Sequence, residues 1–246
     1  MHRFFLEQED RITEGSITLL HPETINHLVK VLRARVNEKI ELISISSVYI
    51  CTIETISSTE VVLSILEQKS HENESSVSIT LYQCLPKSDK LELILQKNVE
   101  LGVNHFVLVS SKRCVVDYKE KDVPKKMERF SKIIKEAAKQ SKRDRIPSIQ
   151  GITSLKNVLQ QIGDFDLFLV LYEQESASDI KTRLKHFEGK KIAVLIGPEG
   201  GFESSEVNLL TEAGALSTTL GKRILRTETA GFVAVSCLQY EFGAFE

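Results

Sequence analysis

Apolar residues follow one pattern in the first third of the chain and a different one in the rest. Up to residue 67, short runs rich in β-branched residues are separated by polar turns, at 41–45, 48–53 and 61–65. Such runs are typical of strands in a small barrel. Between Pro22 and about Leu32 the apolar residues instead recur at helical spacing. The first part of the chain therefore predicts a β-barrel interrupted by one helix.

From Val77 onward, predicted strands alternate with predicted helices, which favours a parallel sheet covered on both faces. Strands are expected near 77–85, 104–110, 166–172, 191–196 and 216–220. Helices are expected at about 88–101, 123–143, 153–162, 177–187, 204–213 and 227–242. The segment 68–76 contains no apolar residue and is predicted to link two domains, residues 1–70 and 77–246.

Composition limits the class of protein without identifying it. A chain of 246 residues with 41% hydrophobic residues can bury one large core or two modest ones. Its apolar runs are much shorter than the roughly 20 residues that span a bilayer, and its start becomes acidic too early for a signal sequence. We therefore expect a cytoplasmic globular protein. The four cysteines are far apart and lack a partner ligand at metal spacing, so no metal site and no disulfide framework are expected.

The net charge of −2 conceals a strong asymmetry along the chain. The net charge is −5 for residues 1–83, +7 for residues 84–145 and −4 for residues 146–246. A basic stretch of this size attracts phosphate backbones, but lysine-rich helices also serve as solvated faces. Charge alone leaves both interpretations open.

A glycine-rich turn, 197–201, follows the predicted strand 191–196 and precedes a helix that Glu203 or Ser204 would cap. Turns at the carboxyl ends of parallel strands often bind ligands, although such a turn can also be purely structural. It lacks the lysine and the spacing of the familiar phosphate loops. Glu199, Glu203 and Glu206 would occupy the positive field that a phosphate needs. A phosphate-free, positively charged ligand such as S-adenosylmethionine fits this turn better.

A second glycine turn, 220–226, leads through charged residues into the predicted last helix. Thr227 is predicted to cap that helix. A capping box would need an acid at Ala230, which leaves Glu228 for another role. Arg226 and Glu228 could also form an ordinary surface ion pair.

These two turns, taken with four other segments spread over nearly the whole chain, resemble the RsmE family of 16S ribosomal RNA uridine-N3 methyltransferases. The other segments are His2–Phe5, His27–Arg33, Gln96–Val103 and Glu136–Arg143. The resemblance implies a PUA-like RNA-binding β-barrel domain at 1–70 and an α/β SPOUT-type methyltransferase domain at 77–246, with a parallel sheet. It also implies a trefoil knot and an S-adenosylmethionine site within about 165–235. The hydrophobic pattern itself does not predict a knot, because chains rarely thread their own loops.

The resemblance also implies roles for individual residues. Arg226 would stabilise negative charge on the uracil, and Glu228 would accept the N3 proton, with a path through water left open. Glu173 would close the first cofactor loop, although it matches the family in position more than in residue identity. The expected cofactor-binding residues are Leu171, Tyr172, Ile196, Gly197, Pro198, Glu199, Gly200, Gly201, Leu220, Gly221, Ile224, Leu225, Arg226 and Thr229. The expected RNA-binding residues are Arg3, Lys30, Arg33, Arg35, Lys112, Arg113, Lys139, Lys142, Arg143 and Arg145.

The partner implied is ribosomal RNA, in the small subunit or in its assembly intermediate. A homodimer is also implied, with an interface near Phe232, Val235, Leu238 and Gln239 of the last helix. Two other functions stay open on the residues alone. One is a non-catalytic ribosomal RNA-binding protein, and the other is an α/β enzyme that binds a phosphate-containing nucleotide.

Overall fold

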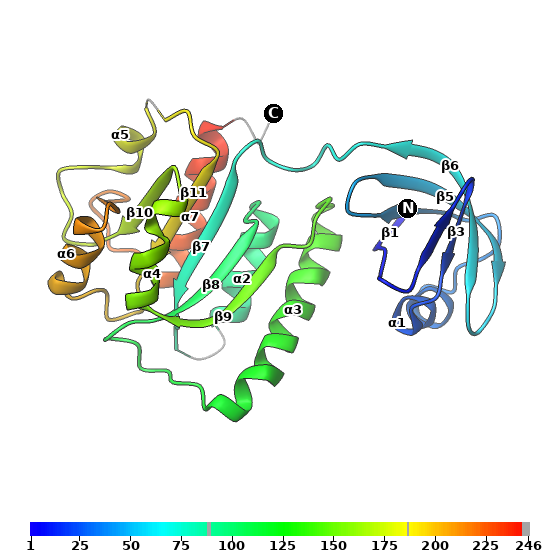
Figure 1. Ribbon diagram of the computed structural model, residues 1–246, viewed down its shortest axis with the longest axis horizontal. Coiled ribbons are helices and arrows are strands. Elements are labelled where there is room, and N and C mark those ends of the chain that lie inside the picture. The colour runs from blue at the N-terminus through cyan, green and yellow to red at the C-terminus, as the bar shows by residue number, and fades with distance from the viewer. Residues whose placement is uncertain (88–89, 186, 243–246) are drawn as a thin grey trace. The chain divides into compact units, whose positions relative to one another are not determined.

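The computed structural model describes residues 1–87, 90–185 and 187–242 (Figure 1). The chain folds into two compact units. The first unit comprises Met1–Glu74 together with Lys142–Arg145, and the second comprises Ser75–Ser141 together with Ile146–Glu246. The segment Lys142–Arg145 therefore folds with the N-terminal unit, whereas its place in the sequence had assigned it to the second domain.

The first unit is a six-stranded sheet in the order β1-β4-β5-β6-β3-β2. The strands β1 and β4 are parallel, and the other neighbours are antiparallel. Alternate residues of the strands are fully buried, among them Ile17, Ile40 and Ile53, and these form the core of the predicted barrel. The strand bounds are β1 His2–Phe5, β2 Arg11–Thr13, β3 Ser16–Leu19, β4 Lys39–Ile43, β5 Val48–Ile56 and β6 Val61–Lys69.

The predicted helix of this unit is present in two parts. The α-helix α1, Pro22–Asn26, begins with a proline at its first turn and continues into a π-helical turn, His27–Val31. Ile25 and Leu28 are buried against the sheet, which is why apolar residues recur there at helical spacing. Arg33 follows in a left-handed conformation, with φ of 51°.

The predicted linker 68–76 is more ordered than its composition suggested. Strand β6 continues to Lys69. The buried carboxylate of Asp144 then accepts hydrogen bonds from the backbone N–H groups of Glu72 and Asn73, at 2.8 and 2.7 Å. These bonds fasten the end of the linker to the segment Lys142–Arg145.

Two residues predicted to bind RNA lie inside this cluster. Arg143 is 4% exposed and forms an ion pair of 2.6 Å with Glu74, while Arg3 is paired with Glu41 and Asp144. A guanidinium enclosed by carboxylates of its own chain does not face an RNA phosphate. The predictions that Arg3 and Arg143 contact RNA are therefore corrected: both hold the first unit together.

The second unit is a six-stranded, all-parallel sheet in the order β12-β10-β11-β7-β8-β9. Its central strands are almost wholly buried and consist of continuous apolar runs, as expected when helices cover both faces (Figure 1). The strand bounds are β7 Ser78–Cys84, β8 His105–Ser110, β9 Ser148–Ser154, β10 Leu167–Leu171, β11 Lys191–Ile196 and β12 Leu216–Thr218. The helix bounds are α2 Lys90–Glu100, α3 Val123–Gln140, α4 Leu155–Gln161, α5 Ile180–Leu184, α6 Ser204–Glu212 and α7 Thr227–Glu241, with short 3-10 turns at Glu120–Asp122 and Ile162–Asp164.

Strand β9 is the one element of this sheet that the sequence did not predict. It lies at the sheet edge, paired with β8 on one side, and most of its residues are partly exposed. Its sequence therefore lacks the apolar run that identified the other strands. The helix expected from residue 153 begins only after Ser154, whose hydroxyl accepts a hydrogen bond from the backbone N–H of Asn157 at 3.3 Å.

The last helix, α7, packs its apolar side within the same chain. Val235 and Leu238 are fully buried, and Gln239 is 2% exposed and donates a hydrogen bond of 3.0 Å to the carbonyl of Leu101. These three side chains face the interior of their own chain, so a dimer interface near them would have to use other side chains of α7. Tyr240, on the same helix, is 79% exposed.

Candidate active site

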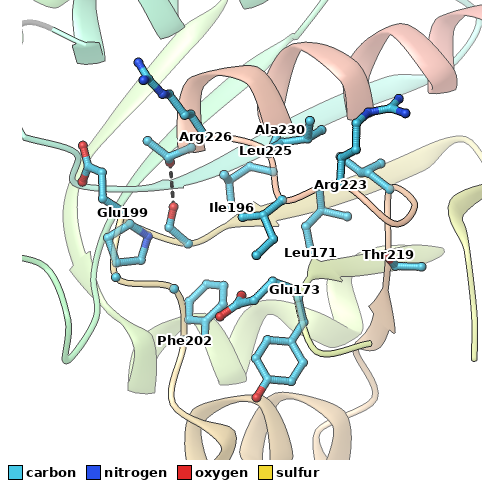
Figure 2. Close-up of a pocket in the computed structure, with 18 of the residues that line it drawn as sticks. Leu171, Glu173, Ile196, Glu199, Phe202, Thr219, Arg223, Leu225, Arg226 and Ala230 are labelled. Atoms are coloured by element: carbon cyan, nitrogen blue, oxygen red, sulfur yellow. Dashed lines mark hydrogen bonds between the residues drawn. The ribbon is translucent and has the colours of Figure 1, made fainter. Parts of the chain in front are cut away.

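One cavity of about 460 Å³ opens at the carboxyl ends of β10, β11 and β12 (Figure 2). Parallel pairing sets Leu171 beside both Ile196 and Thr218, so the loops that follow these three strands start at the same edge of the sheet. Ligands bind at this edge in open parallel sheets. The cavity wall consists of residues 171–173, 196–202 and 218–227, together with Lys90 and Ala230.

Thirteen of the fourteen residues predicted to bind the cofactor lie on this wall. The exception is Thr229, which is half-buried in the first turn of α7. Glu173, the least well matched residue of the first loop, also lines the cavity. The three loops were expected to converge, and the structure brings them together.

The glycine turn after β11 packs closely against the side chain of Glu173. Gly201 has φ of +66°, and a Cβ atom there would lie 2.5 Å from a carboxylate oxygen of Glu173. The predicted cap of the next helix is present, because Glu203 and Glu206 form a capping box, with the Glu203 N–H donating to Glu206 Oε2 at 2.9 Å. Glu206 is 3% exposed and so already occupies the positive end of α6.

Thr227 has a different role from the predicted helix cap. Arg226 occupies the N-cap position of α7 and makes no side-chain cap hydrogen bond. The hydroxyl of Thr227 donates to the carbonyl oxygen of Gly197 at 2.6 Å, drawn as a dashed line in Figure 2. It also accepts a hydrogen bond of 3.0 Å from the side-chain amide of Gln83. Thr227 therefore joins the two glycine turns and the end of β7.

Lys90 stands between two carboxylates beside the cavity. Its Nζ lies 3.1 Å from Glu199 Oε1 and 3.2 Å from Glu228 Oε2. The hydrogen bond to Glu199 is the main reason why the pKa of Lys90 is raised, against the effect of burial and with a smaller contribution from Glu228. Lys90 lines the cavity, whereas Glu228 does not.

The carboxylate of Glu199 is held ionised. Burial opposes ionisation, but hydrogen bonds from backbone N–H groups, including that of Lys87 at 3.1 Å, and the nearby Lys90 outweigh it and lower the pKa of Glu199. Lys90 was not among the site residues that the sequence predicted. A signal existed, since Lys90 starts the helix after β7 and so lies at the carboxyl edge of the sheet.

The cavity wall combines apolar and charged side chains. In Figure 2 the side chains of Arg223 and Arg226 point away from the space between Leu171, Ile196 and Leu225, and Glu199 lies on the same side as Arg226. The two arginines are exposed. A ligand in the cavity would therefore meet apolar side chains and backbone together with the charged residues Lys90 and Glu173 of the wall.

Basic residues of the β8–α3 loop contact the glycine turn. Arg113 donates a hydrogen bond of 2.9 Å to the carbonyl of Gly200, and Lys112 Nζ lies 2.9 Å from Glu203. The remaining residues predicted to bind RNA are Lys139, which pairs with Glu136, and the exposed Lys30, Arg33, Arg35, Lys142 and Arg145.

Within the part of the chain that the structure describes, His, Cys, Asp and Glu side chains form no group that could hold a metal ion. Among the same residues, no helix combines the length and the apolar character that a membrane crossing requires.

Comparison with known proteins identifies the class of protein that this fold and cavity define. Residues 73–239 match the family model of an RNA methyltransferase domain, and residues 20–66 match that of an RNA methyltransferase PUA domain. The expected fold class, a PUA-like domain followed by a SPOUT-type methyltransferase domain, is confirmed.

Relatives of nearly equal length identify the family. The chain is 35% identical to the ribosomal RNA small subunit methyltransferase E of Bacillus subtilis, over 98% of this chain and 97% of that protein. It is 30% identical to the protein of the same name from Aquifex aeolicus, over 97% and 99%. A crystal structure of the Neisseria gonorrhoeae protein of that name, bound to S-adenosyl methionine, superimposes with a TM-score of 0.86 at 32% identity and covers 98% of this chain and 97% of that one. The chain belongs to the ribosomal RNA small subunit methyltransferase E family, RsmE.

Proposed function

We propose that this protein transfers a methyl group from S-adenosylmethionine to N3 of a uridine in the 16S RNA of the small ribosomal subunit. Membership of the family supplies the reaction class, and the Neisseria relative was solved with this cofactor. The observation that carries the proposal is the convergence of three strand-end loops on one cavity at the carboxyl edge of the parallel sheet.

The cavity suits S-adenosylmethionine. Its volume of about 460 Å³ lies within the range of small-molecule sites, and the turn at Gly200 and Gly201 lets backbone approach a ligand closely. The buried Glu206 already occupies the end of α6 that would otherwise attract a phosphate. When bound, the cofactor supplies the methyl group that is transferred.

Two side chains of the proposed mechanism come from the start of α7. We assign to Arg226, exposed at the rim, the stabilisation of negative charge that develops on the uracil oxygens. We assign to Glu228 the acceptance of the N3 proton through a bridging water, because its carboxylate lies outside the cavity wall. The carboxylate of Glu228 is half-buried, and its Oε2 lies 3.2 Å from the ammonium group of Lys90.

The same proposal includes two partners, ribosomal RNA and a second copy of the chain. Exposed basic residues would hold RNA phosphates without reading the sequence, so the choice of base would come from the cavity and from the shape of the RNA. The substrate would be the small subunit or its assembly intermediate, in the cytoplasm. We also propose a homodimer, for which the exposed side chains of Ile224 and Tyr240, 85% and 79% accessible, offer apolar surface.

Calorimetry and methyl transfer test the proposal against its alternatives. Titration with S-adenosylmethionine should release heat of binding, whereas ATP and NAD should not. Incubation with labelled cofactor should transfer the label to small subunits that lack the modification. A protein that binds the RNA without binding the cofactor would instead be a non-catalytic RNA-binding protein, and one that binds ATP or NAD tightly would be a nucleotide-dependent enzyme.

A further inference from the structure

The position of Lys90 fixes an ammonium group at the cavity wall. Lys90 is the first residue of α2, and the helix behind it is anchored by the fully buried Ile94 and Leu95. The two carboxylates that flank its Nζ, at 3.1 and 3.2 Å, belong to the glycine turn after β11 and to the first turn of α7. Three separate segments of the second unit therefore hold one ammonium group at the cavity wall.

An ammonium group has three N–H donors and no acceptor. The nitrogen of Lys90 lies 3.1 Å from Glu199 and 3.2 Å from Glu228, and because Lys90 also lines the cavity, the same ammonium group is available to a group bound there. Both carboxylates hold the charge in place, since either would lose a close cation if Lys90 were neutral. A fixed cation stabilises a transition state best when the opposite charge appears only during the reaction.

The charges around Glu228 come from several elements. Lys90 faces it from α2, Glu199 lies across Lys90 on the turn after β11, and Arg226 precedes it at the N-cap of α7. From β7 the neutral amide of Gln83 bonds to Thr227, the neighbour of Glu228. The helix α5 also packs against α7, and its Arg183 donates a hydrogen bond of 2.9 Å to the carbonyl oxygen of Ser217. Lys90 is thus the cation that the structure pairs directly with Glu228.

We propose that Lys90 is a further catalytic residue, whose ammonium group, held by Glu199 and Glu228, stabilises the negative charge that the uracil gains as its N3 proton leaves. The inference rests on the proposed function. As the N3–H bond breaks, its electron pair stays on nitrogen and its proton passes to the acceptor. The nitrogen pair then forms the bond to the methyl carbon while the carbon–sulfur bond breaks and its pair returns to sulfur. Charge builds up on the uracil oxygens before the new bond neutralises it, and Lys90 acts in that interval.

Charge removal at Lys90 tests this role. In single-turnover assays with saturating cofactor and unmodified small subunits, Lys90→Met should be slower by roughly 100-fold near neutral pH, the effect typical of losing one such electrostatic donor. Without the cation the N3 proton is harder to remove, so the rising limb of the pH–rate profile should move about one unit toward higher pH. Affinity for S-adenosylmethionine, measured by calorimetry, should change by less than about threefold. Lys90→Arg keeps the charge and should recover most of the rate.

The possible outcomes distinguish a failure of the proposed function from a failure of the role of Lys90. If the natural protein transfers no methyl group to uridine N3, the proposed function fails. If it does, and Lys90→Met keeps the natural rate and profile, the role of Lys90 fails alone. A loss that is equal at every pH, or one that Lys90→Arg does not repair, would make Lys90 merely structural and would also overturn the inference. Should Lys90→Met not fold, Lys90→Gln removes the charge, keeps an amide donor for the carboxylates, and must show the same shift.

Discussion

The hydroxyl of Thr227 donates a hydrogen bond of 2.6 Å to the carbonyl oxygen of Gly197 and so ties the start of α7 to the turn that ends β11. The two residues lie 30 positions apart. Both line the cavity, so this one bond fixes the spacing between two of its three loops.

Replacement of Thr227 by valine should loosen the cavity. The methyl group cannot donate to Gly197 or accept from Gln83, and an unpaired buried polar group costs about 1–3 kcal/mol. We expect a lower melting temperature and roughly tenfold weaker binding of S-adenosylmethionine by calorimetry. Thr227→Ser keeps the hydroxyl and should bind almost normally. Equal affinity of the serine and valine variants would show that this bond does not hold the cavity in shape.

Asp144 should make the stability of the first unit depend on pH. Burial opposes its ionisation, but hydrogen bonds from Asn73, Glu72 and Arg3 outweigh it and lower its pKa. A carboxyl whose pKa is lower in the folded state stabilises the fold fully above its unfolded value, about pH 4, and loses that contribution as pH falls through the folded value.

Asp144→Asn should therefore destabilise the first unit by about 3 kcal/mol at pH 7, since a buried ion pair loses one partner, and by less near pH 2. Hydrogen exchange of the Glu72 and Asn73 amides, which donate to this carboxylate, reports the change locally. The exposed Asp122→Asn serves as the control. Unchanged protection of both amides at pH 7 would contradict the structural role of Asp144.

Cys114 should be the reactive thiol of the chain. The hydrogen bond with Cys84 is the main cause that lowers its pKa to about 6, against burial and with help from Ser111, whose N–H lies 3.4 Å from the sulfur. Burial instead raises the pKa of Cys51 to about 11. Because the thiolate is the nucleophile, alkylation of Cys114 should reach half its maximal rate near pH 6, while Cys51 should stay unmodified. Peptide mass spectrometry measures the alkylation of both residues. A Cys114 rate that rises only above pH 8 would refute this.

Arg226 and Arg145 should affect methyl transfer in different ways. Arg226 lines the cavity, so Arg226→Ala should lower the single-turnover rate more than it weakens RNA binding. Arg145 is exposed on the first unit, so Arg145→Ala should mainly weaken binding and reduce the slope of log affinity against log salt by about 1. A normal rate with a reduced salt slope for Arg226→Ala would make Arg226 a backbone anchor.

The sequence predicted the parts of the fold in which local pattern and tertiary role agree. The glycine turn 197–201 and the buried strands beside it have strong local signals, and the loop positions followed from the rule that parallel strands end at one edge. Strand β9 was missed because an exposed edge strand does not need an apolar run. Its partner β8 decides its conformation.

The residues whose roles the sequence predicted wrongly have partners that lie far away along the chain. Nothing local shows that Arg143 meets Glu74, 69 positions away, or that Asp144 receives the linker amides. The same holds for Lys90, whose two partners lie in segments more than 100 residues further along the chain. The basic character of a residue was visible in the sequence, but whether it faces solvent or a carboxylate depends on the folded chain.

The position of the transferred methyl group tests the central claim most directly. Small ribosomal subunits that lack the modification should be incubated with this protein and isotopically labelled S-adenosylmethionine, and the RNA then digested to nucleosides for mass spectrometry. The label should appear in N3-methyluridine, at one nucleotide per small subunit. Label on a ribose hydroxyl or on another base, or no label despite cofactor binding, would contradict the account.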